Sequence, residues 1–249
     1  QALYRSQKQT EEAKEELSKM NEIKDKMFTV LSHDLRGSFG SIKNYAAFIL
    51  DEYKHKEDKK LSESLEIILL SCHSTYDLLN NLLEWSKMQI DRLDCQPSVF
   101  SINDLIDNAL VAHQAPAHFK AISLTALSEG QYMVRADRNM IELVIRNLLS
   151  NALKFTPFGG TIQLKTSLTP KGVRVSIQDS GVGINPELLK QLERLEHYVS
   201  QPGTQGEKGA GLGLSLAREY LKQNASQLEI ASTLGQGTNI SFLLQQKSF

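Results

Sequence analysis

The sequence has little cysteine, no strong net charge and no long apolar run, and each of these shortages argues against a class of protein. Cys72 and Cys95 are the only cysteines among 249 residues, and neither lies in a Cys-x-x-Cys pair or a Cys/His cluster. This argues against a zinc site and a disulfide scaffold and favours a reducing compartment. The 28 Lys and Arg residues nearly balance the 29 Asp and Glu residues. The chain therefore offers no basic surface for a nucleic-acid backbone, and we expect no nucleic-acid partner.

Membrane segments are also lacking. No apolar run approaches the roughly 18 residues that a transmembrane helix needs, and no signal-peptide pattern opens the chain. The first residue is Gln1 rather than methionine, so we treat the sequence as a piece of a longer protein. We expect a cytoplasmic portion, with membrane attachment, if any, only through a missing N-terminal region.

The N-terminal part of the chain is helical by its apolar periodicity. Residues 1–24 are rich in Gln, Glu and Lys with sparse apolar positions, which predicts a coiled-coil signalling helix or, alternatively, a solvated single helix. Residues 25–95 contain two amphipathic patterns separated by the charged stretch "YKHKEDKK", which predicts a helical hairpin. Two helices bury too little apolar surface alone, so we expect a homodimer in which two hairpins form a four-helix bundle.

The pattern changes after Pro97, and residues 97–249 predict an α+β unit. "SINDLIDNALVAHQ" reads as a helix with Ser101 as N-cap, and "NMIELVIRNLLSNALKFT" as a longer helix that ends before Pro157. "AISLTALS", "TIQLKTSLT" and "VRVSIQD" alternate as strands do, and the tail forms a hairpin around Gly235 and Gly237. This order suggests one sheet covered by helices.

Three polar side chains interrupt the longer helix on one face. Asn147 and Asn151 are four residues apart and Lys154 follows three later, so they project together. Two amides and an ammonium on an apolar helix require partners if buried. Amide oxygens and a cation suit Mg²⁺ with a phosphate group, whereas a plain surface stripe is the alternative.

Two glycine-containing segments complete the candidate site. "DSGVG" follows a strand and is either an ordinary turn or an adenine pocket, in which Asp179 accepts a hydrogen bond from an amino group beside Gly181 and Gly183. "GTQGEKGAGLGLSLAREY" leads into a helix near Leu212, whose first N–H groups suit an anion. It is neither a P-loop nor a dinucleotide-binding fingerprint, because Gly209 follows Lys208 and residue 214 is Leu.

These segments resemble the sequence boxes of sensor histidine kinases of two-component systems. "FTVLSHDLRGS" resembles the phosphoacceptor box, "IRNLLSNALKFT" the N box, "DSGVGI" the first glycine box, "GEKGAGLGLSLA" the second, and "GQGTNISF" the last glycine-threonine element. They occur in the family's order. The resemblance implies a dimerisation and phosphotransfer hairpin followed by a catalytic ATP-binding domain, an α/β sandwich of the gyrase-like ATPase class.

The resemblance also implies a role for each matching residue. His33 would be the phosphoacceptor and Asp34 the acid that orients its imidazole, because only a neutral imidazole with a free lone pair attacks phosphorus. Asn151 and Asn147 would bind Mg²⁺ and Lys154 a phosphate of ATP. The adenine site would comprise Asp179, Gly181, Gly183 and Thr238, and the ATP lid Lys208, Gly209, Gly211, Leu212 and Gly213. The phosphoryl group would pass to the receiver domain of a response regulator.

The sequence departs from the family at two points. Gly37 and Ser38 stand where the family usually has Asn or Thr followed by Pro, which predicts weak phosphatase activity because Gly37 has no side chain to orient a water. The paired phenylalanines after the first glycine box are also missing. Two alternatives stay open: a catalytically degenerate dimeric scaffold that binds ATP, and an ATPase or serine kinase of the same nucleotide-binding class.

Overall fold

The computed structural model describes residues 39–40, 42–49, 68, 72, 75, 79–81, 95–194, 203–204 and 213–247. The chain divides into two compact units, Gln1–Leu93 and Asp94–Phe249. The described residues of the first unit are all helical. The predicted coiled-coil segment, His33, Asp34, Gly37 and Ser38 lie outside the described residues. No helix in the described ranges is long and apolar enough to cross a membrane.

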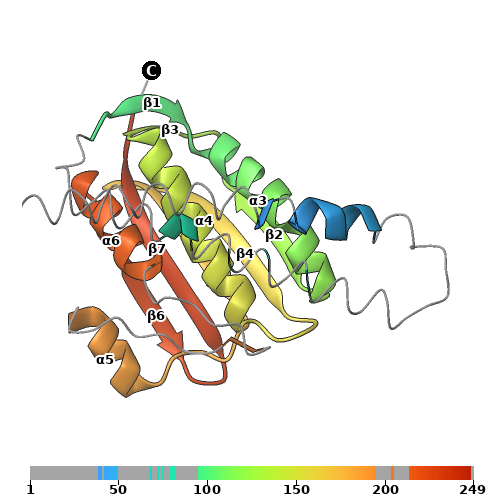
Figure 1. Ribbon diagram of the computed structural model, residues 1–249. Coiled ribbons are helices and arrows are strands. Elements are labelled where there is room, and N and C mark those ends of the chain that lie inside the picture. The colour runs from blue at the N-terminus through green and yellow to red at the C-terminus, as the bar shows by residue number, and fades with distance from the viewer. Residues whose placement is uncertain are drawn as a thin grey trace, which may run out of the picture. The chain divides into compact units, whose positions relative to one another are not determined.

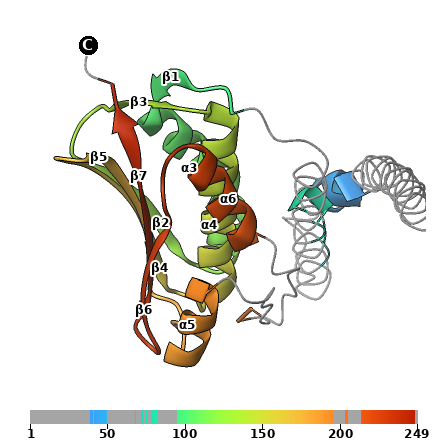
Figure 2. The same ribbon diagram turned by 90° about the vertical axis from the view of Figure 1, so that its left-hand side faces the viewer.

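The second unit is a seven-stranded sheet with helices on one face (Figure 1, Figure 2). This confirms the predicted α+β sandwich. In chain order, its elements are β1 (Ser98–Ser101), α3 (Ile102–Phe119), β2 (Ser123–Ser128), β3 (Met133–Ala136), α4 (Arg138–Phe155), β4 (Thr161–Thr169), β5 (Gly172–Asp179), α5 (Pro186–Arg194), α6 (Gly213–Gln223), β6 (Glu229–Thr233) and β7 (Gly237–Gln246).

The strand order places distant segments side by side. The main order is β1-β3-β7-β5-β4-β2, and β6 pairs with the beginning of β7. Only β2 and β4 are parallel among these pairs. β5 and β7 pair from Val173 opposite Leu244 to Asp179 opposite Thr238. The end of β5 and the start of β7 therefore meet at one end of the sheet.

The core lies between the sheet and the helices. Alternate residues of β5 point inward, and Val173, Val175 and Ile177 are at most 2% exposed. Helix α4 covers them with a continuous apolar face that includes Ile141 and Ile145, both fully buried. Burying one such side chain contributes about 1.5–3 kcal/mol. This packing fixes α4 over the centre of the sheet.

Both ends of α4 are set by local hydrogen bonds. Asp137 is the N-cap, and its carboxylate Oδ1 accepts the N–H of Met140 at 3.1 Å. At the other end Thr156 leaves the helical conformation before Pro157, and its hydroxyl donates to the carbonyl of Ala152 at 2.7 Å. Proline lacks the N–H that would continue the helix. The helix predicted from the apolar periodicity is thereby confirmed.

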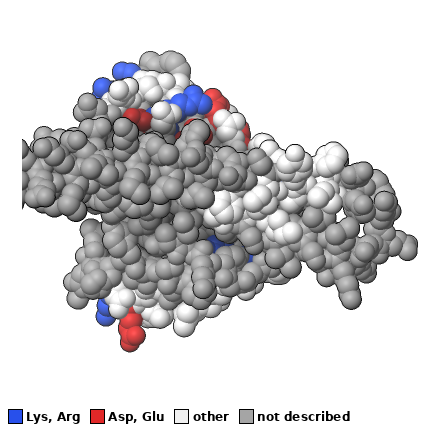
Figure 3. Space-filling model, in the orientation of Figure 1, with Lys and Arg blue, Asp and Glu red and all other residues white. Residues whose placement is uncertain are grey.

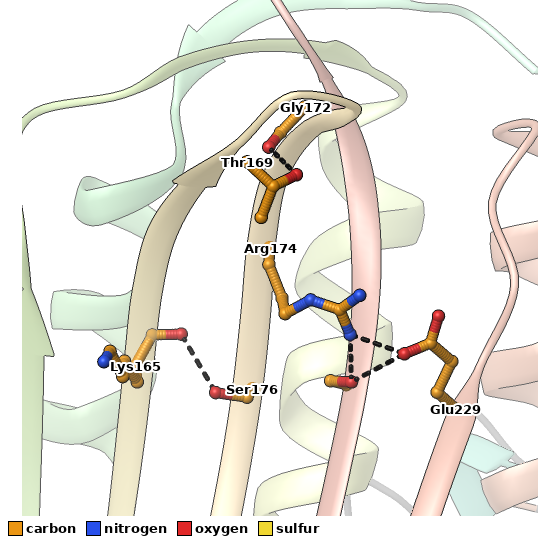
Figure 4. A network of polar contacts seen from close by, with 7 residues as sticks. Lys165, Thr169, Gly172, Arg174, Ser176 and Glu229 are labelled. Atoms are coloured by element: carbon orange, nitrogen blue, oxygen red, sulfur yellow. Dashed lines mark hydrogen bonds and ion pairs between the residues drawn. The ribbon is translucent and has the colours of Figure 1, made fainter.

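The face of the sheet opposite the helices carries polar side chains. On it, Arg174 of β5 contacts Glu229 of β6 and donates to the hydroxyl of Ser241 at 2.9 Å (Figure 4). The hydrogen bond from Arg174 lowers the pKa of the exposed Glu229 carboxyl. The polar side chains on this uncovered face explain the inside-outside alternation of the strands. Figure 3 shows the other side, which the helices cover, and the described basic and acidic side chains visible there lie near one another.

Several features of this unit were not predicted from the sequence, helix α5 among them. Strands β1 and β3 have only four residues each, too few to show a clear alternation. Helix α3 begins after its predicted N-cap, Ser101, but continues through Pro116 to Phe119. The predicted stretch ended at Gln114, five residues before the observed end of the helix.

Candidate functional site

Three polar residues form a row across the end of the sheet. Asp179 of β5 lies opposite Thr238 of β7, which in turn lies opposite Ser232 of β6. Asp179 and Thr238 are each 9% exposed. The sheet thus brings together two predicted site residues that are 59 positions apart in the sequence, and adds a third that the sequence did not indicate.

One oxygen of the Asp179 carboxylate is held by the backbone. Oδ1 accepts the N–H of Gly181 at 2.8 Å and the N–H of Thr238 at 3.1 Å. Within the described part of the chain, Oδ2 accepts no hydrogen bond. Burial raises the pKa of Asp179, and the two N–H donors offset part of this effect. The result is a fixed acceptor for a ligand that donates, such as an amino group.

The loop after β5 is attached to the end of α4. The N–H of Val182 donates to the carbonyl of Phe155 at 3.1 Å. A Cβ on Gly181 would lie 2.6 Å from that same carbonyl oxygen and 2.6 Å from Asp179 Oδ1. Only glycine permits this approach. Gly183 lies in the same loop, where a Cβ would meet the carbonyl of Thr233 at 2.1 Å.

Helix α4 carries the predicted phosphate-binding face in its last two turns. Asn147 is 6% exposed, whereas Asn151 and Lys154 are half-buried. In the described ranges, neither asparagine amide makes a hydrogen bond. The Lys154 ammonium lies 4.9 Å from the centre of the Phe155 ring. Amide oxygens that make no hydrogen bond within the protein are suitable Mg²⁺ ligands, and a lysine ammonium suits a phosphate, so this residue set fits a metal and phosphate group.

A second lysine stabilises the end of the same helix. Lys120 is 4% exposed, and its Nζ donates to the carbonyls of Leu153 at 2.8 Å and Lys154 at 3.3 Å, and to the hydroxyl of Thr204 at 2.9 Å. The N–H of Thr204 also donates to the Lys154 carbonyl, at 3.1 Å. A cation is favourable at a helix C-terminus. Lys120 and Thr204 therefore fix the backbone that carries Lys154.

Some predicted residues cannot be located at this site. His33 and Asp34 belong to the first unit and lie outside the described residues, as do the loop residues Lys208, Gly209, Gly211 and Leu212. Gly213 is described and begins helix α6. The described site thus comprises the base side, around Asp179, and the α4 side, around Asn147.

Comparison with known proteins agrees with this geometry. The model of the His Kinase A (phospho-acceptor) domain matches residues 23–90, and that of the Histidine kinase-, DNA gyrase B-, and HSP90-like ATPase matches residues 136–248. Histidine protein kinase DivJ of Caulobacter vibrioides is 32% identical over 217 residues, which is 86% of this chain and 36% of DivJ. The chain therefore spans about a third of the length of this relative.

Solved structures share the fold. The crystal structure of full-length ShkA in complex with AMPPNP matches this chain with a TM-score of 0.62 and 21% sequence identity. The match covers 90% of this chain and 46% of the ShkA chain. The catalytic domain of histidine kinase ThkA matches with a TM-score of 0.53 and 25% sequence identity. This match covers 61% of this chain and 96% of the ThkA domain.

The fold and the two matched domains define the class: a phosphoacceptor domain followed by a gyrase-like ATPase domain. The chain belongs to the sensor histidine kinases of two-component systems.

Proposed function

We propose that this chain uses ATP to phosphorylate His33 and passes the phosphoryl group to an aspartate of a response regulator. One observation carries this proposal: a fixed carboxylate acceptor, Asp179, and a polar helical face around Asn147 are joined by the loop that attaches Val182 to Phe155. A nucleotide needs both kinds of site at once, one for its base and one for its phosphates. Neither part alone would favour a nucleotide.

Each part of the site has a specific chemical task. Asp179 accepts the amino group of adenine, with Gly181 and Gly183 shaping the pocket. Lys154 contacts a phosphate, and Asn151 and Asn147 hold Mg²⁺, which when bound neutralises phosphate charge. Positioning and charge neutralisation account for most of the catalysis of phosphoryl transfer. The loop from Lys208 through Gly209, Gly211 and Leu212 to Gly213 covers the phosphates.

In the first unit, the proposed chemistry rests on His33 and Asp34. A neutral imidazole offers a lone pair to the γ-phosphorus, while the carboxylate orients the ring and stabilises the proton on the other nitrogen. The phosphorus–nitrogen bond forms as the bond between the γ-phosphorus and the bridging oxygen of ADP breaks.

The proposed activity also implies how the chain is divided into domains and which partners it has. Residues 25–95 form the dimerisation hairpin of a homodimer, residues 1–24 a coiled-coil signalling helix, and residues 97–249 the catalytic domain. The acceptor is the receiver domain of a response regulator. We place this portion in the cytoplasm, with any membrane attachment in a preceding region of the protein.

The test is incubation of the purified chain with γ-labelled ATP and Mg²⁺, beside a His33→Gln variant. His55→Gln is the matched control, since it removes a histidine from the polar stretch between the two helical patterns. The label should be alkali-stable and acid-labile, absent from the first variant and retained by the second. A label that persists in His33→Gln assigns the phosphoacceptor elsewhere. Absence of label in the wild-type chain, with ATP still bound, would leave a nucleotide-binding scaffold.

A further inference from the structure

Ser232 is a polar residue of β6 that connects three parts of the base side. Its hydroxyl oxygen accepts the N–H of Ile184 at 2.9 Å, lies 2.9 Å from the carbonyl oxygen of Gly237, and lies 2.9 Å from the hydroxyl oxygen of Thr238. One side chain therefore contacts the loop after β5, the β6–β7 turn and the hydroxyl beside Asp179. These contacts occupy the full hydrogen-bonding capacity of a serine hydroxyl.

Only one arrangement of protons satisfies all three contacts at once. A carbonyl accepts and a backbone N–H donates, so the single proton of Ser232 must point to the Gly237 carbonyl oxygen. The short contact between the two hydroxyls then requires Thr238 to donate to Ser232. Thr238 thereby directs its only hydroxyl proton away from Asp179, and its oxygen presents lone pairs alone.

Thr238 and Asp179 are neighbours in the sheet, which gives this proton arrangement a chemical consequence. The Thr238 N–H donates to Asp179 Oδ1 at 3.1 Å, so Oδ2 and the Thr238 hydroxyl oxygen are the atoms that remain for a ligand. Both are acceptors in the arrangement that Ser232 imposes. A ligand that contacts these two oxygens must therefore present hydrogen-bond donors to them.

We infer that Ser232 is a positioning residue that sets the base specificity of this site, by holding Thr238 in the acceptor state. The inference rests on the proposed nucleotide site and adds the determinant of its preference. At C6 a 6-amino purine offers two N–H donors, whereas a 6-oxo purine places a carbonyl oxygen there against two acceptors and keeps its donor only at N1. Unpaired polar groups in a buried site reject the wrong ligand strongly.

Replacing Ser232 by alanine releases the Thr238 proton. The Thr238 hydroxyl then rotates freely and donates to a carbonyl of the ligand, which relieves part of the penalty against a 6-oxo base. One hydrogen bond to a neutral partner corresponds to about 10-fold in binding. The ratio of inosine triphosphate to ATP dissociation constants should therefore fall about 10-fold in Ser232→Ala.

The experiment is calorimetric titration of the full chain with Mg²⁺ and either ATP or inosine triphosphate. Ser232→Thr keeps a hydroxyl and should retain the wild-type ratio. Thr238→Val removes the released proton, so in that background Ser232→Ala should leave the ratio unchanged. These two variants separate proton positioning from general weakening of the loop.

Two results overturn the inference. If Ser232→Ala weakens both nucleotides equally, Ser232 only supports the loop. If Ser232→Ala shifts the ratio as much in the Thr238→Val background as in the wild type, the effect does not pass through Thr238. A wild-type chain that binds neither nucleotide refutes the proposed nucleotide site itself, whereas a wild-type preference for ATP with an unchanged ratio in Ser232→Ala refutes only the inference.

Discussion

Replacing Gly237 by alanine tests whether the close contact between β5 and β7 positions Asp179. Gly237 has a φ of +94°, and a Cβ there would lie 2.0 Å from the carbonyl oxygen of Asp179. Real Cβ contacts are essentially never shorter than 3.0 Å, so the two strands must separate by about 1 Å in a close-packed region. The bond from the Thr238 N–H to Asp179 Oδ1, already 3.1 Å long, would then weaken.

Gly235 provides a matched control in the same hairpin. It also has a positive φ, +78°, but a Cβ there would meet nothing within 4 Å. Alanine at either position adds left-handed strain of about 1–2 kcal/mol. Only Gly237→Ala adds the clash, for which overpacking costs about 1–3 kcal/mol more.

Binding should separate the two variants more clearly than stability does. A displacement of about 1 Å at a functional group can reduce activity 10²-fold, so we expect Gly237→Ala to weaken Mg²⁺-ATP binding about 10- to 100-fold. Gly235→Ala should stay within about 2-fold, since it moves no group that touches Asp179. Calorimetric titration measures the affinities and scanning calorimetry the stabilities. Equal loss of affinity in the two variants would refute the positioning argument.

Two further substitutions test the buried charges. Asp179→Asn should abolish ATP binding. It should nevertheless leave the nucleotide-free protein at least as stable as wild type at neutral pH, because burial raises the pKa of Asp179 in the folded state and the ionised carboxylate therefore opposes folding. Thermal unfolding at several pH values should show that the stability difference between Asp179→Asn and wild type shrinks as the pH falls through the folded-state pKa of Asp179. A difference that grows in acid would contradict burial of the ionised carboxylate as its cause. Lys120→Met should destabilise the protein by about 1–3 kcal/mol, because two helix-end carbonyls lose a buried donor. The control Lys165→Met removes only an exposed ion pair with Glu129 at 3.0 Å, so the free energy of unfolding should fall by only about 0–1 kcal/mol. Urea titration measures both variants, and similar losses of stability would count against the role of Lys120.

Sequence reasoning was most informative where the signal was local. The spacing of apolar residues predicted helix α4, and the three-and-four spacing of Asn147, Asn151 and Lys154 placed them on one face of it. The alternation in "VRVSIQD" predicted that β5 would end at Asp179, which the structure confirms. Residue chemistry and spacing suggested a metal and phosphate face and an adenine pocket but left alternatives open, and the order of the five family boxes favoured these roles over the alternatives.

Residues that act through distant partners gave no such signal. Lys120 reads as an ordinary surface lysine in the sequence, and only the fold brings it to Leu153 and Thr204, 33 and 84 positions away. Ser232 likewise reads as one polar residue in an alternating strand. Its contact with Ile184, 48 positions away, depends on the path of the loop after β5. Both contacts are non-local: one joins the end of α3 to the end of α4, and the other joins the loop after β5 to β6.

The loop after β5 links the two sides of the site. Its residue Val182 donates to Phe155 at the end of α4 and accepts the N–H of Gly235 at 2.8 Å from the β6–β7 turn. Two residues later, Ile184 donates to Ser232. The helix that carries the phosphate-binding face and the strands that carry the base-binding row are thus tied to one short segment. A ligand that shifts this segment from the base side must also strain its bond to α4, so substitutions in the loop should alter both base preference and phosphate binding.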